Sequence, residues 1–230
     1  MAKKIVEGRI RLNNVRLSFP ELFRPKSFQG DDGRESEKRY KGNFLIPKND
    51  GIWDAENPDD KATATYKGET GPILAMLKKA KFDALAFKVG EDKARQMMPK
   101  IKPDKYAVRD GDLETWDGYE GCFYASAANT RKPKIVGRHN KQAVTEEDGI
   151  LYAGCYVNAV ITLWFQAAGK KGDNIVPNAI WATLNAVQFL EDGESFGAGE
   201  VDPEEEFENL TDETDSVSTD DDFDGDDSPI

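Results

Sequence analysis

Cysteine and histidine are scarce in this chain of 230 residues, which has two cysteines and one histidine. A disulfide framework needs several cysteine pairs, and a structural zinc site needs four closely spaced thiol or imidazole ligands. Cys122 and Cys155 stand in separate apolar runs, and only His139 is available to join them. We therefore expect two buried, reduced thiols, and neither a metal site nor a cofactor site.

Long apolar runs are absent as well. No stretch approaches the roughly 18 apolar residues that cross a membrane. The first residues, MAKKIVEG, carry charges where a secretion signal would have an apolar core. We expect a soluble protein of the cytoplasm that does not interact with a membrane.

Positive charge is missing from residues 191–230. All 31 lysines and arginines lie between Lys3 and Lys171, whereas 18 of the 43 acidic residues follow residue 190. The net charge of −12 thus divides into a body of about +6 and a tail of −18. The few apolar residues of the tail are scattered and cannot form a core. We therefore predict a folded domain over residues 1–190 and a disordered acidic tail over residues 191–230.

Apolar and polar residues alternate in five segments of the body. This pattern predicts strands over residues 9–19, 39–46, 121–129, 154–167 and 178–190. The phase slips at Asn13 and Asn14, which is typical of a β-bulge. Pro72 occupies a favoured first position of a helix, and the apolar stripe from Ile73 to Phe87 is predicted to be the buried face of that helix. Residues 20–37, 48–70 and 99–118 are predicted to be loops or irregular segments.

Five strands and one inserted helix indicate a mainly β protein. The predicted fold is an OB-fold-like five-stranded antiparallel barrel with a helical insertion, followed by the disordered tail. A two-sheet sandwich with a helical insertion is the alternative.

The strand faces opposite the predicted core combine positive charge with aromatic rings. Non-specific binding of a single nucleic-acid strand needs cations along the phosphates and ring faces on which bases stack. The predicted cations are Arg9, Arg11, Arg16, Arg39 and Lys41, and the predicted stacking rings are Tyr156, Trp164 and Trp181. The alternative is that these rings pack beneath the loop and helix insertions.

A basic segment follows the third predicted strand. Arg131, Lys132 and Lys134 surround Pro133. A basic arm at the end of a barrel is suited to holding a nucleic-acid strand by its phosphates. We include these three cations in the predicted site; a merely solvated loop is the alternative.

Residues suited to catalysis are few. Asp104, Asp110, Asp112 and Glu114 resemble the ligand set of a two-metal nuclease, but they lack regular spacing, and turn formation explains them more simply. His139 is the single imidazole available to activate a nucleophile, and no phosphate-binding glycine pattern occurs. We predict no catalytic residue and a protein that is not an enzyme.

The tail combines acidic residues with isolated apolar ones near its end. Such a segment is suited to a basic pocket with a hydrophobic slot on a partner protein, whereas the alternative is a tail that only increases solubility. The predicted partner-binding residues are Asp222, Phe223, Asp224, Asp226, Asp227 and Ile230.

Several short segments match a known family in the right order. They are RLSFPELF at residues 16–23 with Pro25 and Lys26, residues 40–48, RDGD at 109–112, residues 121–127 leading into RKP at 131–133, YAGCY at 152–156 and NAVQF at 185–189. Over roughly residues 8–195, the chain resembles the phage and prophage family of single-stranded DNA-binding proteins that includes the protein of Enterobacter phage Enc34.

The resemblance implies an OB-fold, sequence-tolerant binding of single-stranded DNA, and a role in phage replication or recombination in the host cytoplasm. The tail is similar to the acidic tails of other replication proteins that bind single strands, including that of phage T7. We therefore expect a protein that coats single-stranded DNA and recruits replication or recombination proteins through its tail. A protein-interaction adaptor with incidental DNA binding is the alternative.

Overall fold

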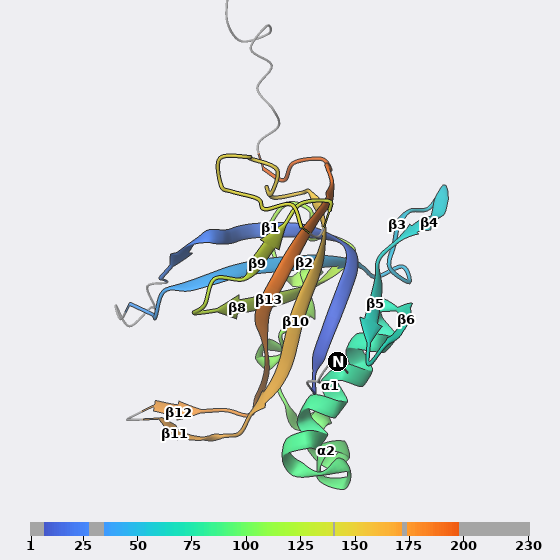
Figure 1. The fold of residues 1–230 in the computed structure, drawn as a ribbon. Helices are drawn as coiled ribbons and strands as arrows, with labels where there is room; N and C mark the ends of the chain where they lie inside the picture. The colour runs from blue at the N-terminus through green and yellow to red at the C-terminus, as the bar shows by residue number, and fades with distance from the viewer. Residues whose placement is uncertain (1–6, 28–34, 140, 172–173, 198–230) are drawn as a thin grey trace, which may run out of the picture. The chain divides into compact units, whose positions relative to one another are not determined.

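Five long strands carry the fold: β1 (Arg9–Lys26), β2 (Arg39–Pro47), β8 (Cys122–Asn129), β10 (Tyr156–Gln166) and β13 (Ala179–Glu191). They belong to a computed structural model that describes residues 7–27, 35–139, 141–171 and 174–197. The strands pair in the order β10-β13-β8-β2-β1, and β1 also pairs with β10, which closes a barrel (Figure 1). This is the predicted OB-type barrel rather than a two-sheet sandwich.

One strand pair of the barrel is parallel. β13 runs parallel to β8, with Thr183 opposite Ala128, while the other four pairs are antiparallel. An odd number of strands cannot alternate in direction around a closed ring, so a five-stranded barrel must contain a parallel pair. The predicted OB-fold-like five-stranded barrel is therefore confirmed, with four antiparallel pairs and this one parallel pair.

Strand β1 bends so that its two halves pair with different partners. The register shifts between Leu12 and Val15, and Asn14 has a positive φ of 53°, which confirms the predicted bulge. The prediction that this strand ends at Phe19 was wrong. The strand continues to Lys26, which pairs with Arg39 of β2, because two register shifts accommodate the intervening prolines.

The barrel interior follows the predicted alternation of β10 and β13. Along β10, residues 157, 159, 161, 163 and 165 are buried, as is Cys155 just before it. β13 buries Ile180, Ala182 and Leu184, and then its pairing skips Asn185. This second bulge turns Val187 inward in place of Ala186.

Strand β2 is buried on both faces. Phe44 and Ile46 point into the barrel as predicted, but Asn43 and Leu45 on the other face are also shielded. Leu45 belongs to a second apolar cluster with Tyr119, Cys122 and Tyr124, which lies outside the barrel. The segment between β7 (Val108–Asp110) and β8 covers this face, and the sequence pattern of β2 alone does not reveal it.

The helical insertion packs against the barrel. It contains α1 (Ile73–Val89) and α2 (Glu91–Met97), and α1 contacts β10, β1 and the short strand β5 (Thr63–Tyr66). Ile73, Leu77 and Ala84 are buried as predicted, but Phe87 is 68% exposed. The buried face of the helix turns towards Leu85, which is fully buried, and away from Phe87. No helix within the described ranges is long and apolar enough to span a membrane.

Several segments predicted to be irregular contain short strands and 3-10 helices. Residues 48–72 form two hairpins, and β5 joins the first half of β1 as an additional sheet strand. The remaining elements are β3 (Ile52–Asp54), β4 (Asn57–Lys61), β5 (Thr63–Tyr66), β6 (Glu69–Pro72), η1 (Met98–Lys100), η2 (Pro103–Lys105), β7 (Val108–Asp110), η3 (Gly111–Leu113), β9 (Lys134–Val136), β11 (Gly169–Lys171) and β12 (Asn174–Val176). The loop prediction for residues 48–70 was therefore wrong.

Candidate nucleic-acid interface

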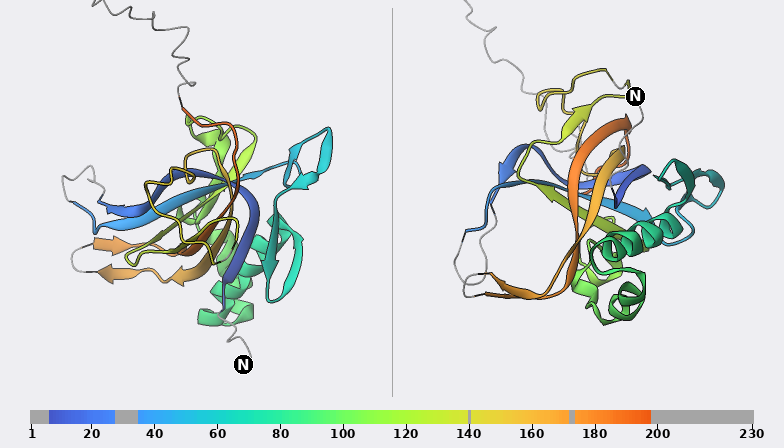
Figure 2. Two further views of the ribbon diagram at one scale, coloured as in Figure 1. Left: turned by 45° about the horizontal axis from the view of Figure 1, so that its top comes forward. Right: turned by 60° about the horizontal axis from the view of Figure 1, so that its bottom comes forward.

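Two arms project from the barrel on the same side. One consists of the outer ends of β1 and β2, and the other is the β11–β12 hairpin between β10 and β13, as both views in Figure 2 show. In OB-folds, the face of the second and third barrel strands and the loops at such positions bind oligonucleotides. Here those strands are β2 and β8, which are neighbours in the barrel. The candidate interface is therefore the outer face of β2 and β8.

Four of the predicted cations meet at one end of β2 and β8. Lys41 lies opposite Ala128 in the strand pair, so Arg39 at the start of β2 is close to the residues that follow β8. Arg131 and Lys132 are exposed there, and the backbone N–H of Arg131 donates to Asn129 Oδ1 at 3.0 Å, which shapes the turn. The side chain of Arg39 lies 3.4 Å from Glu37, an exposed ion pair of little strength.

An aromatic cluster lies farther along the same face, and the sequence interpretation missed it. Phe19 and Trp116 meet edge to face at 5.1 Å, and Tyr119 lies 5.1 Å from Trp116 and 5.0 Å from Tyr124. Tyr119 and Tyr124 are buried, whereas Phe19 is 40% and Trp116 42% exposed. Two ring surfaces are therefore open to solvent on the barrel face that carries the cations at its end, which suits base stacking.

Asn43 of β2 anchors this cluster from below. Its side-chain amide donates to the Tyr119 hydroxyl at 2.7 Å, and burial raises the pKa of that hydroxyl. The only available signal in the sequence was a tryptophan and a tyrosine in a Gly-rich loop, residues 111–121. Because that loop reaches β2 through long-range contacts, neither helical nor strand periodicity could place it. We call Phe19, Arg39, Lys41, Trp116, Arg131 and Lys132 the β2–β8 face.

Trp164 and Trp181 form a directly opposed cross-strand pair on β10 and β13. Trp164 is 41% exposed, while Trp181 is half-buried and donates from Nε1 to Gln166 Oε1 at 3.3 Å. Both rings lie on the face opposite the barrel interior. We call them the tryptophan pair.

Arg9 and Arg11 lie near the tryptophan pair rather than on the β2–β8 face. Arg9 is exposed and pairs with Thr162, which makes it a same-face neighbour of Trp164. Arg11 is exposed too, and its guanidinium donates to Asn13 and to Thr65. Lys134, in the separate strand β9, is exposed opposite Ala186. The structure thus divides the predicted cations between two surfaces.

Arg16 and Tyr156 have packing roles in the structure. Arg16 donates from Nε to the Gly154 carbonyl at 2.9 Å, and its guanidinium also bonds the Glu194 carbonyl and stacks 4.3 Å from the Phe196 ring. Tyr156 is half-buried and meets Trp53 edge to face at 5.6 Å; burial raises its pKa. The alternative that aromatics pack beneath insertions fits this ring, so we leave both residues out of the proposed interface.

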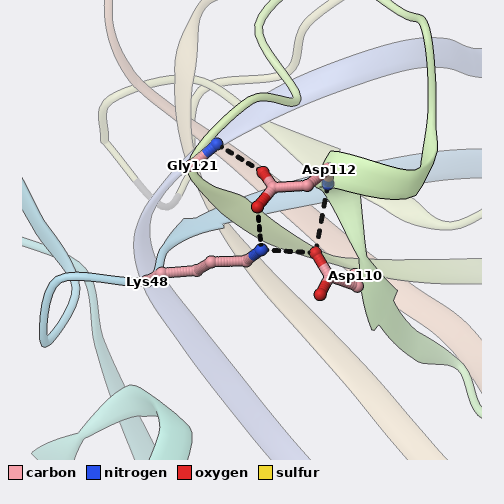
Figure 3. A network of polar contacts seen from close by, with 4 residues as sticks. All are labelled: Lys48, Asp110, Asp112 and Gly121. Atoms are coloured by element: carbon pink, nitrogen blue, oxygen red, sulfur yellow. Dashed lines mark hydrogen bonds and ion pairs between the residues drawn. The ribbon is translucent and has the colours of Figure 1, made fainter.

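The acidic residues considered for a nuclease site are bonded to protein groups instead. Figure 3 shows the Lys48 ammonium bonded to both Asp110 and Asp112, while the other oxygen of Asp112 accepts the Gly121 N–H at 2.7 Å. These bonds raise the pKa of Lys48, and the bonds from Lys48 and Gly121 lower that of Asp112. The network fastens η3 to the ends of β2 and β8.

The other two members of that acidic set are separated from it. Asp104 lies 2.7 Å from Lys105, and Glu114 accepts a hydrogen bond from the Tyr124 hydroxyl. Within the described ranges, no three His, Cys, Asp or Glu residues are grouped so that they could hold a metal ion. Cys122 and Cys155 are free and buried, as expected, and burial raises the pKa of each thiol to about 11. The predicted tail residues 222–230 lie outside the described residues.

Comparison with known proteins gives consistent matches over most of the chain. A family model described as the single-stranded DNA-binding protein of Enterobacter phage Enc34 matches residues 8–218. Protein p50 of Acyrthosiphon pisum secondary endosymbiont phage 1 is 33% identical over 205 residues, covering 88% of this chain and 94% of that protein.

Two solved structures share the fold. The single-stranded DNA-binding protein from bacteriophage Enc34 in complex with single-stranded DNA has a TM-score of 0.60 at 24% identity, with 85% of this chain and 100% of that chain covered. Another structure of the Enc34 single-stranded DNA-binding protein has a TM-score of 0.57 at 24% identity, over 88% of this chain and 94% of that chain.

Proposed function

This chain belongs to the family of the Enterobacter phage Enc34 single-stranded DNA-binding protein, and we propose that it coats single-stranded DNA during phage replication and recombination. The observation that carries this proposal is the β2–β8 face, which combines two exposed aromatic rings, one on β1 and one in the loop before β8, with four cations on β2 and in the turn after β8. The protein acts in the host cytoplasm as a binding protein without catalytic activity.

The β2–β8 face combines the two contacts that a bare strand offers. Phe19 and Trp116 provide ring surfaces for bases, and each stacked base contributes roughly 1–3 kcal/mol. Arg39, Lys41 and the turn at residues 131–132 contact phosphates at the end of the face near the arms. Ring faces and phosphate contacts do not distinguish base edges, so binding tolerates any sequence.

The tryptophan pair extends the path of the bound DNA strand beyond the β2–β8 face. Trp164 offers an exposed ring, and Arg9 and Arg11 provide cations on the neighbouring face of β1. Lys134 follows the turn after β8 and adds a cation at its margin. In this proposal the DNA strand crosses the β2–β8 face first and then reaches the tryptophan pair near the β11–β12 arm.

The acidic tail has two roles in this proposal. It recruits replication or recombination proteins through the acidic and apolar residues from Asp222 to Ile230, and it competes with DNA for the basic surface of the body. The support is the charge distribution alone, with about +6 on residues 1–190 and −18 on residues 191–230. A flexible polyanion held near a basic surface acts at a high effective concentration.

A titration with oligo-dT tests the function. Tryptophan fluorescence should be quenched as Trp116 or Trp164 stacks on bases, and log Kd should rise with log salt by about 0.7 for each contacted phosphate. Duplex of the same length is the control and should bind more weakly. Affinity that does not depend on salt, or tighter binding to duplex, contradicts the proposal and favours an adaptor with incidental DNA binding.

A further inference from the structure

An apolar groove separates the helical insertion from the segment that leads into β8. Its volume is about 900 Å³, and its apolar lining comes from α1, from the stretch between η1 and η3, and from β8. The lining includes Leu77, Phe82, Met98, Val108, Leu113 and Phe123. Leu113 is 80% exposed at this site, which is unusual for a leucine beside an apolar surface. We call this site the insertion groove.

Carboxylates at the insertion groove are already bonded. Asp104 pairs with Lys105 at 2.7 Å, Asp110 bonds Lys48, and Glu114 accepts from the Tyr124 hydroxyl. Each of these carboxylates thus already has a cation or a hydroxyl donor of the protein beside it.

The lysines of the groove have no oppositely charged partner among the described residues. Across the described ranges, the side chains of Lys78 and Lys81 form no ion pair or hydrogen bond; Lys81 lies 4.4 Å over the Tyr106 ring. Burial also lowers the pKa of Lys81, as expected for an ammonium that lacks an anionic partner. The groove offers donors without matching acceptors.

Arg109 adds a second, independent indication of a missing acceptor. It lines the groove, and its guanidinium stacks 5.0 Å from the Tyr124 ring. Its Nε is shielded from solvent and has no hydrogen-bond partner among the described residues. A buried donor without an acceptor is costly, so an oxygen from a ligand at this site would relieve the deficit.

The charge of the whole insertion favours an acidic ligand. Residues 73–105 contain nine lysines and arginines but four acidic residues, which places nearly all of the positive excess of the body there. The ligand that fits therefore has bulky apolar side chains with carboxylates next to them. The tail of this chain has that chemistry: Phe207 and Phe223 each stand directly between two acidic residues, and residues 198–230 contain no lysine or arginine.

We infer that the insertion groove binds the acidic segment of residues 198–230 from a neighbouring copy of the chain. A phenylalanine enters the apolar groove, its flanking carboxylates meet Lys78 and Lys81, and a carboxylate or carbonyl oxygen accepts from Arg109. The inference rests on the proposed function, because a coated strand holds copies next to each other. A random coil of 33 residues spans about 30 Å, a length comparable with the diameter of a small domain. Neighbouring proteins on a strand are thus connected through their tails.

Photo-crosslinking of the full-length chain tests the inference. Leu113→p-benzoylphenylalanine puts a photoreactive group at the groove, and Phe87→p-benzoylphenylalanine, on the exposed side of α1, is the matched control. Natural and ¹⁵N-labelled copies are mixed, with and without oligo-dT, irradiated and digested for mass spectrometry. We expect peptides from residues 198–230 of one label joined to position 113 of the other, and at least about fivefold less of this product from position 87.

A charge reversal gives the second readout. Lys81→Glu in the groove should reduce the inter-chain product several-fold, whereas Lys88→Glu, on the same helix but outside the groove, should not. The inference is overturned if no tail peptide is joined to position 113, or if tail peptides are joined to it only within one chain. Oligo-dT affinity measured on the same proteins distinguishes the two proposals. Oligo-dT binding without the inter-chain crosslink overturns only this inference. The inter-chain crosslink without oligo-dT binding overturns only the proposed function.

Discussion

Trp116 and Trp164 are both about two-fifths exposed, but their surroundings differ. Trp116 contacts Phe19, Tyr119 and Tyr124 through edge-to-face geometry, so one side of its ring is fixed and another faces solvent. Trp164 lies directly opposite Trp181 in the β10–β13 pair. A ring that is already oriented loses little freedom when a base stacks on it, which favours binding.

Trp116→Ala and Trp164→Ala should each weaken binding of single-stranded DNA by roughly 1–3 kcal/mol. The reason is the loss of one stacking surface from a ring that is partly open to solvent. The measurement is a fluorescence-anisotropy titration with labelled oligo-dT, together with a thermal melt. Phe87→Ala is the control, since this ring is 68% exposed on α1 and belongs to neither the β2–β8 face nor the tryptophan pair. If Phe87→Ala weakens binding as much as the tryptophan variants do, the assigned path of the strand is wrong.

Among individual residues, the sequence predicted those that follow an alternating pattern. Trp164 could be placed outside the barrel because β10 alternates without a break over eleven residues. Trp116 could not be placed, because it lies in a loop whose position depends on contacts with β1 and β2. Arg16 was on the predicted face, but its bonds to the Gly154 and Glu194 carbonyls depend on a turn far along the chain.

At the scale of elements, the RDGD segment at residues 109–112 has a structural explanation. Asp110 and Asp112 hold Lys48, and Arg109 stacks on Tyr124. Gly111 is buried between two backbone carbonyls, so that a Cβ there would lie 2.4 Å from the Tyr119 oxygen and 2.6 Å from the Cys122 oxygen. The segment fixes the loop that carries Trp116 to the barrel.

Gly111→Ala should destabilise the protein by about 1–3 kcal/mol, as overpacking against a backbone that cannot move aside usually does. Urea unfolding followed by fluorescence measures the change. Gly169→Ala is the matched control, because a Cβ at Gly169 meets no atom within 4 Å and its stability should stay unchanged. Equal stability of the Gly111→Ala variant and the parent chain would show that the loop shifts freely and does not fix Trp116.

The short strands show where element prediction from sequence fails. The segment of residues 48–70 contains Gly, Pro and many charges, and its own pattern predicts a loop. β5 nevertheless forms, because its backbone pairs with residues 10–13 of β1, far away in the chain. The five barrel strands were predictable since each buries a continuous face, whereas strands added at the margin depend on a partner edge.

At the scale of the whole molecule, charge is divided between two parts of the chain. The body carries about +6 and residues 191–230 carry −18, so the overall acidity of the chain conceals a basic surface. The described residues 192–197 belong with the barrel: the Phe196 N–H donates to the Ala153 carbonyl at 2.9 Å, and Tyr152 bonds Gly193. A truncation that removes tail charge without disturbing these contacts should therefore follow Gly197.

Truncation after Gly197 should raise the affinity for single-stranded DNA, by roughly tenfold at low salt and much less at physiological salt. The tethered acidic residues compete with phosphates for the same cations, and this competition is strongest where the Debye length is about 30 Å rather than about 8 Å. Full-length and truncated proteins are titrated with one oligonucleotide at both salts. A full-length control with the tail carboxylates changed to amides should behave like the truncated form, because charge rather than chain length causes the effect. Coincident curves for the full-length and truncated proteins at low salt would mean that the tail does not compete for the DNA surface, and that its charge acts elsewhere, as in the insertion groove of a neighbour.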